Sequence, residues 1–406
     1  MENLKIENNI LNKNNYFPIS KNEKDKSEKK YNLNRLLFIF FFIIFLIFFL
    51  ILILFKKINI NKNDLLDNYP KLSKESLKEK DINDEFVKNI KIIFNEDEII
   101  ENAMMNKYTT FKIGGPSKYL VKPKTINQII KIITLCNEHK VNYFVLGNGS
   151  NLLVSDIGYY GVIILIHENN FSDLKVIKKT ENIYILNVGA GMLMKTLSIE
   201  ACLLSLTGLE DIIDIPGTIG GGIIMNASFR GSGLFNPLKK VKAINTEGKI
   251  IELTKEECKL RHRGSMLKDK KYLIFEATFE LKKRDQFKIQ KAMTDNTKKR
   301  YEKQPMYFGS AGCFFIWDHN KYGSMYEKYK ESNLVSYRIG NVMIFTYNIA
   351  FIVNLGKGTA SQVMDIVTYI EKIMKEKYNI EMKREVLFNL LTFFIITFQN
   401  LTFIII

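Results

Sequence analysis

The sequence predicts an α+β protein, and three features of the chain carry this prediction. Short apolar runs separated by glycine and aspartate turns extend from about Ile92 to Leu281, as expected for strands. Within that region, Ile126 to Asn137 and Leu193 to Leu206 have apolar residues at helical spacing. A lysine-rich helix near Gln286 to Lys303 then opens a second region, which ends with an amphipathic helix from about Ala360 to Tyr378.

Length and composition exclude several classes of protein. The chain has 406 residues, 46% of them hydrophobic, so two or three domains are expected. The 4 cysteines lie far apart without a C-x-x-C pair, which argues against a metal site or a disulfide framework. The formal charge of +16 comes from lysines spread over the whole chain, and no basic stripe is interleaved with aromatic residues. We therefore expect no nucleic acid partner, although a positive cleft would concentrate anionic phosphate ligands.

The segment Leu36–Phe55 predicts a transmembrane helix. It contains only Leu, Ile and Phe, and about twenty such residues span a hydrocarbon core. A cleaved signal peptide fits poorly, because a long polar stretch precedes the segment and no small-residue cleavage motif follows it. Lysines are nearly balanced on its two sides, so the flanking charge predicts no orientation. We expect a single-pass membrane protein with its folded part on a cytosol-like side.

The chain is expected to divide into six segments. They are an Asn/Lys-rich tail (1–35), the transmembrane helix (36–55), a linker (56–90), a first domain (91–283), a second domain (284–386) and a hydrophobic tail (387–406). The first tail and the linker contain too few apolar residues to fold alone. The last tail is either a second membrane-active segment or not part of the native product.

Three glycine-rich loops in the first domain carry the chemistry. They are Tyr108–Pro116, Leu146–Leu153 and Ile215–Gly221. Glycine has no Cβ and tolerates positive φ, so backbone N–H groups in such loops can closely approach phosphate oxygens. Any one loop alone could be an ordinary tight turn. Three in order favour a dinucleotide site, and it is not a Rossmann site, because a strand rather than a helix follows Gly147-x-Gly149.

The residues expected to hold this ligand come from all three loops. They are Thr109, Lys112, Gly114, Gly115, Gly147, Asn148, Gly149, Ser150, Asn151, Pro216, Gly217, Thr218, Gly220 and Gly221.

From Asn102 to Val386 the order of motifs resembles the UDP-N-acetylenolpyruvoylglucosamine reductase family. The matching blocks are Tyr108–Pro116, Leu146–Asp156, Gly208–Glu210, Pro216–Ala227, Gln304–Pro305, Phe351–Asn354 and Glu385–Val386. The resemblance implies a flavin domain of the vanillyl-alcohol oxidase (PCMH) type that binds FAD noncovalently, followed by a smaller α+β substrate domain. It also implies that NADPH reduces FAD, which passes hydride to the enolpyruvyl group of UDP-N-acetylglucosamine and forms UDP-N-acetylmuramate for peptidoglycan. The short interval from Gln304 to Cys313 is similar to the form of the family that lacks an extra tyrosine-bearing loop.

Three catalytic residues follow from the resemblance. Arg263 matches the family's arginine, Cys313 stands where the family usually has a serine, and Glu385 matches its late glutamate. Hydride addition to the terminal carbon of the enol ether leaves an aci-carboxylate or enolate, which Arg263 would stabilise together with a protonated Glu385. The adjacent carbon then takes a proton, and a thiol with a pKa near 8.5 is a stronger acid than a serine hydroxyl. Cys313 is therefore the expected proton donor.

Other interpretations remain open at these positions. The arginine could be exposed near a hairpin, the glutamate a solvated charge, and the cysteine a buried strand residue. The sequence also departs from the family pattern at His262, at Ile316–Asp318 and at Asn348–Ala350. These departures favour two alternatives, which are a flavoprotein oxidoreductase of the same fold with another substrate and a catalytically silent flavin-binding membrane protein.

Overall fold

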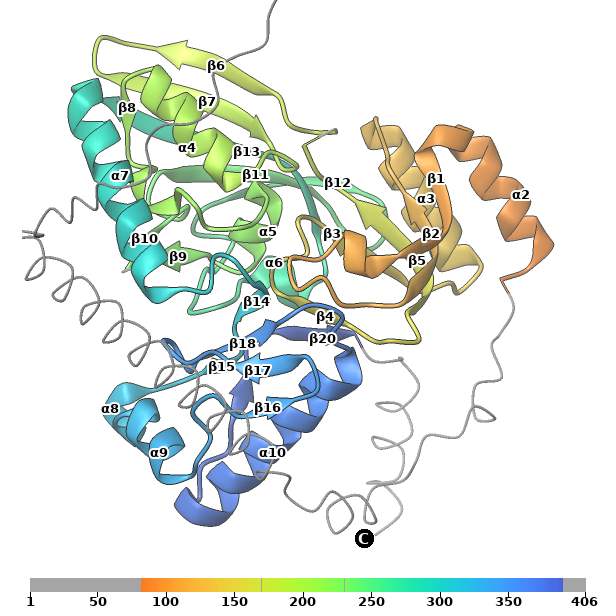
Figure 1. Ribbon diagram of the computed structural model, residues 1–406. Helices are drawn as coiled ribbons and strands as arrows, with labels where there is room; N and C mark the ends of the chain where they lie inside the picture. Colours follow the sequence, from red (N-terminus) through yellow and green to blue (C-terminus); the bar gives the residue numbers. More distant parts are fainter. Residues whose placement is uncertain (1–81, 169, 230, 390–406) are drawn as a thin grey trace, which may run out of the picture. The chain divides into compact units, whose positions relative to one another are not determined.

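The computed structural model describes residues 82–168, 170–229 and 231–389 (Figure 1). In this part of the chain two larger sheets precede the long helix α7 (Gln286–Lys303), a third larger sheet follows it, and the remaining strands form two-stranded pairs. The α+β prediction is confirmed. The helix predicted at 286–303 has the predicted bounds because Asp285 accepts a hydrogen bond from the Lys288 N–H at its start, and Gln304 is extended at its end.

The first sheet has the strand order β1-β2-β5-β3. Its strands are β1 (Ile99–Met104), β2 (Pro116–Val121), β3 (Tyr143–Leu146) and β5 (Tyr159–Leu165). β1 is antiparallel to β2, whereas β2 and β3 are both parallel to β5. The parallel crossover from β2 is made by α3 (Ile126–Glu138), which begins at a capping box of Thr125 and Gln128.

Alternate residues of this sheet enter two different cores. Tyr119 and Val162 face α3 and α2 (Asp84–Ile93), whereas Leu120 and Ile163 face the opposite side. That opposite side is covered by β4 (Leu152–Val154), the 3₁₀ turn Met105–Lys107 and the loops beside them. The first two glycine loops therefore lie on the face of the sheet that is away from the helices.

The second sheet is antiparallel, with the order β12-β11-β13-β7-β6, and β8 pairs with β13. Its strands are β6 (Leu174–Lys179), β7 (Ile183–Gly189), β8 (Leu206–Thr207), β11 (Leu238–Ile244), β12 (Ile250–Thr254) and β13 (Leu273–Lys283). The smaller elements beside it are α4 (Met194–Leu203), the 3₁₀ turn Glu210–Ile212, α5 (Ile219–Ile224), β9 (Ser228–Phe229), β10 (Ser232–Gly233) and α6 (Met266–Asp269).

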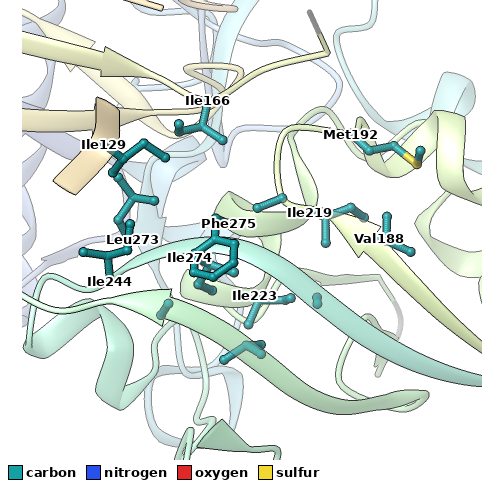
Figure 2. Close-up of a cluster of buried hydrophobic side chains, with 14 of the residues drawn as sticks. Ile129, Ile166, Val188, Met192, Ile219, Ile223, Ile244, Leu273, Ile274 and Phe275 are labelled. Carbon is teal, nitrogen blue, oxygen red and sulfur yellow. The ribbon is translucent and has the colours of Figure 1, made fainter. Parts of the chain in front are cut away.

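One hydrophobic core joins the first two sheets. Figure 2 shows part of it, where Ile129 of α3 and Ile166 lie near Leu273 and Ile274 of β13. Ile219 of α5 belongs to the same cluster and is fully buried. Because burial of a large aliphatic side chain contributes about 1.5–3 kcal/mol, this shared core fixes the third glycine loop against both sheets.

The third sheet is antiparallel, with the order β14-β18-β17-β16. Its strands are β14 (Gly309–Cys313), β16 (Arg338–Ile339), β17 (Val342–Ile344) and β18 (Phe351–Asn354), and the helices beside it are α8 (His319–Tyr322), α9 (Met325–Glu331) and α10 (Ala360–Tyr378). α10 lies along β16 and β17 (Figure 1). It buries Val363, Ile366, Val367 and Ile370, the helical spacing from which this helix was predicted.

Two strand pairs connect the end of the chain to earlier elements. β15 (Phe315–Ile316) pairs with β19 (Lys383–Arg384), and β20 (Leu387–Asn389) runs parallel to β4 in the first half of the chain. Asp156, which follows β4, accepts hydrogen bonds from the N–H groups of Ala360 and Ser361 at the start of α10. The core of the third sheet likewise includes Phe111 and Leu153 from the glycine loops.

Some boundaries differ from the sequence prediction. α2 begins at Asp84, inside the predicted linker, because Asn83 caps it and Phe86 and Ile90 are fully buried. β20 begins at Leu387, inside the predicted hydrophobic tail, and the rest of that tail lies outside the described residues. The predicted helix 193–206 is shorter, since Leu206 belongs to β8.

The predicted membrane location is wrong. Among the residues that the structure describes, no helix is both long and apolar enough to cross a membrane. The two described helices of at least 18 residues, α7 and α10, each carry several charged side chains. The segment Leu36–Phe55, from which the span was predicted, lies outside the described residues.

Candidate active site

A cavity of about 1480 Å³ lies where the glycine loops meet the third sheet. Its wall includes the loop at 147–151, the loop at 214–218, and Cys313 at the end of β14. The side chains of Arg263 and Glu385 also line it. All three residues predicted to be catalytic are therefore brought to one cavity, from positions that are far apart in the sequence.

The loop at 147–151 presents free donors to this cavity. In the part of the chain that the structure describes, the backbone N–H groups of these five residues donate to no protein acceptor. Gly149 has φ +60°, and a Cβ there would clash with the carbonyl oxygen of Tyr108. A Cβ on Gly147 would clash with the hydroxyl of Thr218. The three loops thus pack so closely that only glycine fits at these two positions, and the N–H groups stay available for a ligand.

The third loop supplies another part of the wall. The residues of the predicted set that line the cavity here are Pro216, Gly217, Thr218, Gly220 and Gly221. Thr218 caps α5 by accepting a hydrogen bond from the Gly221 N–H at 3.3 Å. The N–H groups of Ile219 and Gly220 donate to the carbonyls of Met192 and Ala190. Much of this loop is therefore held by protein hydrogen bonds, unlike the loop at 147–151.

The first loop supports the site more than it lines it. Lys112 lies on the cavity wall, but Thr109, Gly114 and Gly115 do not. The Thr109 hydroxyl donates to the Ile113 carbonyl inside the protein, and Gly114 (φ +137°) would bring a Cβ within 2.9 Å of Val154. Within this loop these three residues shape the turn, and their assignment to the cofactor stays a prediction.

Two of the predicted cofactor residues make side-chain contacts with the protein. Asn151 Nδ2 donates to the carbonyl of Glu385 at 3.2 Å. Asn148 Oδ1 lies 3.1 Å from His167 Nε2, and burial lowers the pKa of His167. Asn151 therefore links the second glycine loop to the strand end that carries the predicted catalytic glutamate.

A tight turn places Arg263. Arg261 and Gly264 exchange two backbone hydrogen bonds, and Arg263 between them has φ +55°, which is uncommon for a residue with a side chain. Arg263 Nε lies 2.9 Å from Glu385 Oε1, at an angle outside that of a hydrogen bond. The contact is thus an ion pair, and its side chains are only 26% and 13% exposed.

Two hydrogen bonds hold the backbone of Glu385, one from Asn151 to its carbonyl and one from its own N–H. Its N–H donates to the Phe314 carbonyl at 2.9 Å, next to Cys313. Burial raises the pKa of its carboxyl, and the cations Arg263 and Lys268 partly oppose this shift. The environment therefore favours a protonated form more than water would.

Cys313 ends β14 at an irregularity in the strand. Gly312 has φ +84°, and the register to β18 shifts between Ser310 and Cys313. Burial, with a smaller contribution from Glu385, raises the pKa of the Cys313 thiol to about 11, against the influence of Arg263 and Arg300. The thiol consequently holds its proton at neutral pH.

Two cavity residues were missed from the sequence. Arg300 of α7 lines the cavity and is only 5% exposed. Lys268 of α6 also lines it, and burial lowers its pKa. A signal for Arg300 was present, because it shares one face of α7 with Ile289 and Asn296, the other buried residues of that helix.

The departures from the family pattern lie away from the cavity wall. His262 is exposed, and neither it nor Ile316–Asp318 lines the cavity. Asp318 instead caps α8, and Trp317 Nε1 donates to the Gly323 carbonyl. Asn348 Nδ2 donates to the Lys303 carbonyl. In the described structure these residues therefore make local framework contacts.

The arrangement defines a class of protein, a flavin-type dinucleotide-binding domain with a second domain over the cavity. Residues 117–254 match a family model described as an FAD binding domain. Residues 304–389 match the C-terminal domain of UDP-N-acetylenolpyruvoylglucosamine reductase.

Curated relatives and a solved structure identify the family. The chain is 34% identical over 299 residues to the UDP-N-acetylenolpyruvoylglucosamine reductase of Clostridium novyi, covering 74% of this chain and 94% of the relative. The corresponding protein of Clostridium botulinum is 33% identical and covered to 97%. The crystal structure of this reductase from Thermus caldophilus aligns with a TM-score of 0.59 and 29% identity, covering 70% of this chain and 97% of that one. The chain belongs to the UDP-N-acetylenolpyruvoylglucosamine reductase family.

Proposed function

We propose that this chain reduces enolpyruvyl-UDP-N-acetylglucosamine to UDP-N-acetylmuramate with NADPH and bound FAD, a step in the synthesis of peptidoglycan precursors. Family membership supports the reaction. The observation in this chain that carries the proposal is one cavity that unites free backbone donors with Arg263, Cys313 and Glu385. Bound FAD would carry hydride from NADPH to the terminal carbon of the enolpyruvyl group.

The glycine loops would hold the cofactor. The free N–H groups at 147–151 suit its diphosphate, since successive backbone donors form an anion-binding concavity. Pro216–Gly221 would continue the binding surface, and Lys112 would add a positive charge. Thr109, Gly114 and Gly115 would act indirectly, by shaping the first loop.

Arg263 would stabilise the negative charge that develops on the substrate. After hydride addition, charge spreads onto the carboxylate beside the reacting carbons, and a fixed buried cation is more effective there than in water. Glu385 holds the guanidinium in place through the 2.9 Å contact. Burial raises the pKa of this carboxyl and so brings it closer to protonation, and the protonated form would donate a hydrogen bond to the same charge.

Cys313 would complete the reaction by giving its proton to the carbon that bears the carboxylate. Its pKa of about 11 keeps the proton on sulfur until a strongly basic carbon is present. The thiolate left behind would be stabilised by the two guanidinium groups that act on this thiol, those of Arg263 and Arg300. Solvent then returns a proton to the sulfur.

The second domain, predicted at 284–386, would contribute the substrate half of the site. Its hydrophobic core is largely its own, formed by α10 and the third sheet. Cys313 and Glu385 both come from it, whereas Arg263 comes from the first domain. Substrate would accordingly bind between the glycine loops and the third sheet.

A turnover assay of the full chain tests this proposal. We expect the purified protein to oxidise NADPH in proportion to added enolpyruvyl-UDP-N-acetylglucosamine, and UDP-N-acetylglucosamine itself to have no effect because it lacks the enol ether. NADPH oxidation that is unaffected by the enolpyruvyl compound would contradict the proposed substrate.

A further inference from the structure

Arg300 is a buried cation without an ion-pair partner. Its residue is 5% exposed and lines the cavity from α7. Among the described residues no carboxylate lies within 4.0 Å of its guanidinium nitrogens, and Nε makes no hydrogen bond. Its contact is with the Phe229 ring, whose centroid lies 5.0 Å from Cζ. Burial accordingly lowers the pKa of this arginine.

The acid that influences Arg300 is already engaged. Asp214 acts on Arg300 electrostatically, but its carboxylate lies 3.1 Å from Lys195 Nζ and accepts a hydrogen bond from the Thr297 hydroxyl. A buried guanidinium with no anion beside it is costly, because desolvation is not offset by an ion pair or a full set of hydrogen bonds. The side chain therefore suits an anion that arrives with a ligand.

The position of Arg300 indicates which anion this is. The Cys313 thiol is influenced by two guanidinium groups, those of Arg263 and Arg300. Arg263 is already paired with Glu385 at 2.9 Å, whereas Arg300 is not paired. The carbon that Cys313 would protonate is bonded directly to the substrate carboxylate. This carboxylate must therefore lie next to the Cys313 thiol when the proton is transferred.

We propose that Arg300 binds the carboxylate of the enolpyruvyl group and thereby holds the adjacent carbon at the Cys313 thiol. This assignment rests on the proposed function. It adds to the three residues predicted from the family motifs, and it divides the two cations by task. Arg300 anchors the charge that the substrate already has, and Arg263 stabilises the charge that develops.

Binding of two nucleotide sugars tests the assignment without turnover. UDP-N-acetylmuramate, the product, has a carboxylate on its lactyl group, whereas UDP-N-acetylglucosamine shares its uridine, diphosphate and sugar but lacks the lactyl group and so has no carboxylate. Dissociation constants would be measured by calorimetry on the flavin-loaded full chain and on its Arg300→Met variant. Loss of a hydrogen-bonded charge pair should weaken UDP-N-acetylmuramate roughly 10- to 100-fold. UDP-N-acetylglucosamine should bind the variant as it binds the parent.

A matched control is available one residue earlier. Lys299 lies on the exposed side of the same helix, so Lys299→Met removes a positive charge without touching the cavity, and both affinities should stay unchanged. If Arg300→Met does not fold, Arg300→Gln, which retains donors but no charge, is judged by the same comparison. If neither variant folds, the charge is needed by the fold itself and the proposal is overturned.

Other outcomes would also overturn it. Equal weakening of both nucleotides would place Arg300 at a group that they share, such as the diphosphate. Loss of FAD from the variant would place it at the cofactor, and unchanged affinities would leave it a packing role. A parent that binds UDP-N-acetylmuramate selectively but does not turn over the enolpyruvyl compound would instead contradict the proposed function and leave the assignment of Arg300 standing.

Discussion

Replacement of Cys313 separates its chemical role from a packing role. NADPH reduces the flavin without a proton from this side chain, so Cys313→Ala should leave that half-reaction nearly unchanged. Reoxidation by the enolpyruvyl substrate should slow ~10²- to 10⁴-fold, the usual loss for a positioned acid. At 1.36 kcal/mol for each tenfold change, this is about 2.7–5.4 kcal/mol in the barrier.

The structure also predicts what serine does at this position. Cys313 ends a strand beyond the Gly312 turn, and the same turn would present a serine hydroxyl from nearly the same point. Cys313→Ser should therefore retain much more reoxidation activity than Cys313→Ala. A buried cysteine that only packs would behave differently, with similar modest effects on both half-reactions and with alanine tolerated better than serine.

Stopped-flow traces of the two half-reactions, recorded separately for each variant, give the answer. The Cys313 thiol has a pKa of about 11, so it still holds its proton at pH 7 and at pH 9. Loss of this proton should therefore not lower the parent's rate of flavin reoxidation between roughly pH 7 and pH 9. An alanine variant that reoxidises as fast as the parent, or slows equally in both steps, would refute the reasoning.

Three further predictions concern the residues around Cys313 and the cofactor loop. Arg263→Lys should slow reoxidation ~10²- to 10³-fold, as loss of a fixed donor at a developing charge does, with flavin reduction by NADPH as the internal control. Burial raises the pKa of the Glu385 carboxyl above its ordinary value of 4.5. The parent therefore loses folding stability as pH rises from 4.5 through the folded-state pKa. Glu385→Gln cannot titrate, so the difference between its Tm and that of the parent should increase with pH. Gly147→Ala should purify with much less FAD, because its Cβ clashes with Thr218. Gly356→Ala strains the backbone at φ +108° but meets nothing within 4 Å and lies off the cavity wall, so it should retain FAD, as absorbance of the purified proteins will show.

The sequence predicted those parts of the fold that depend on local pattern. α7 and α10 have the predicted bounds because capping residues and helical periodicity coincide at their ends. The glycine loops were predicted to form one site because three glycine-rich motifs occur in order, and in the structure close contacts between the loops require glycine at Gly147 and Gly149. Residues of the first loop were harder to assign, since a motif does not reveal which of its members face the ligand.

Features that depend on distant contacts could not be predicted in this way. The β20–β4 pair joins Leu387 to Leu152, and nothing near Leu387 in the sequence indicates that partner. Arg300 lies in a lysine-rich helix, where one more basic residue resembles a solvated charge, and its spacing from Ile289 and Asn296 is the only sequence signal. Contacts with the first domain, such as the Phe229 ring, accompany its burial. The apolar segment Leu36–Phe55 dominated the prediction of location, which the described helices do not support.

A single anaerobic turnover tests the central claim most directly. The purified full-length protein would be reduced with NADPH until its flavin is colourless, and enolpyruvyl-UDP-N-acetylglucosamine would then be added in the absence of oxygen. The account predicts that the flavin colour returns and that mass spectrometry finds UDP-N-acetylmuramate, heavier than the substrate by two hydrogen atoms, in an amount equal to the flavin reoxidised. A flavin that NADPH reduces but that stays reduced after the substrate is added would contradict it.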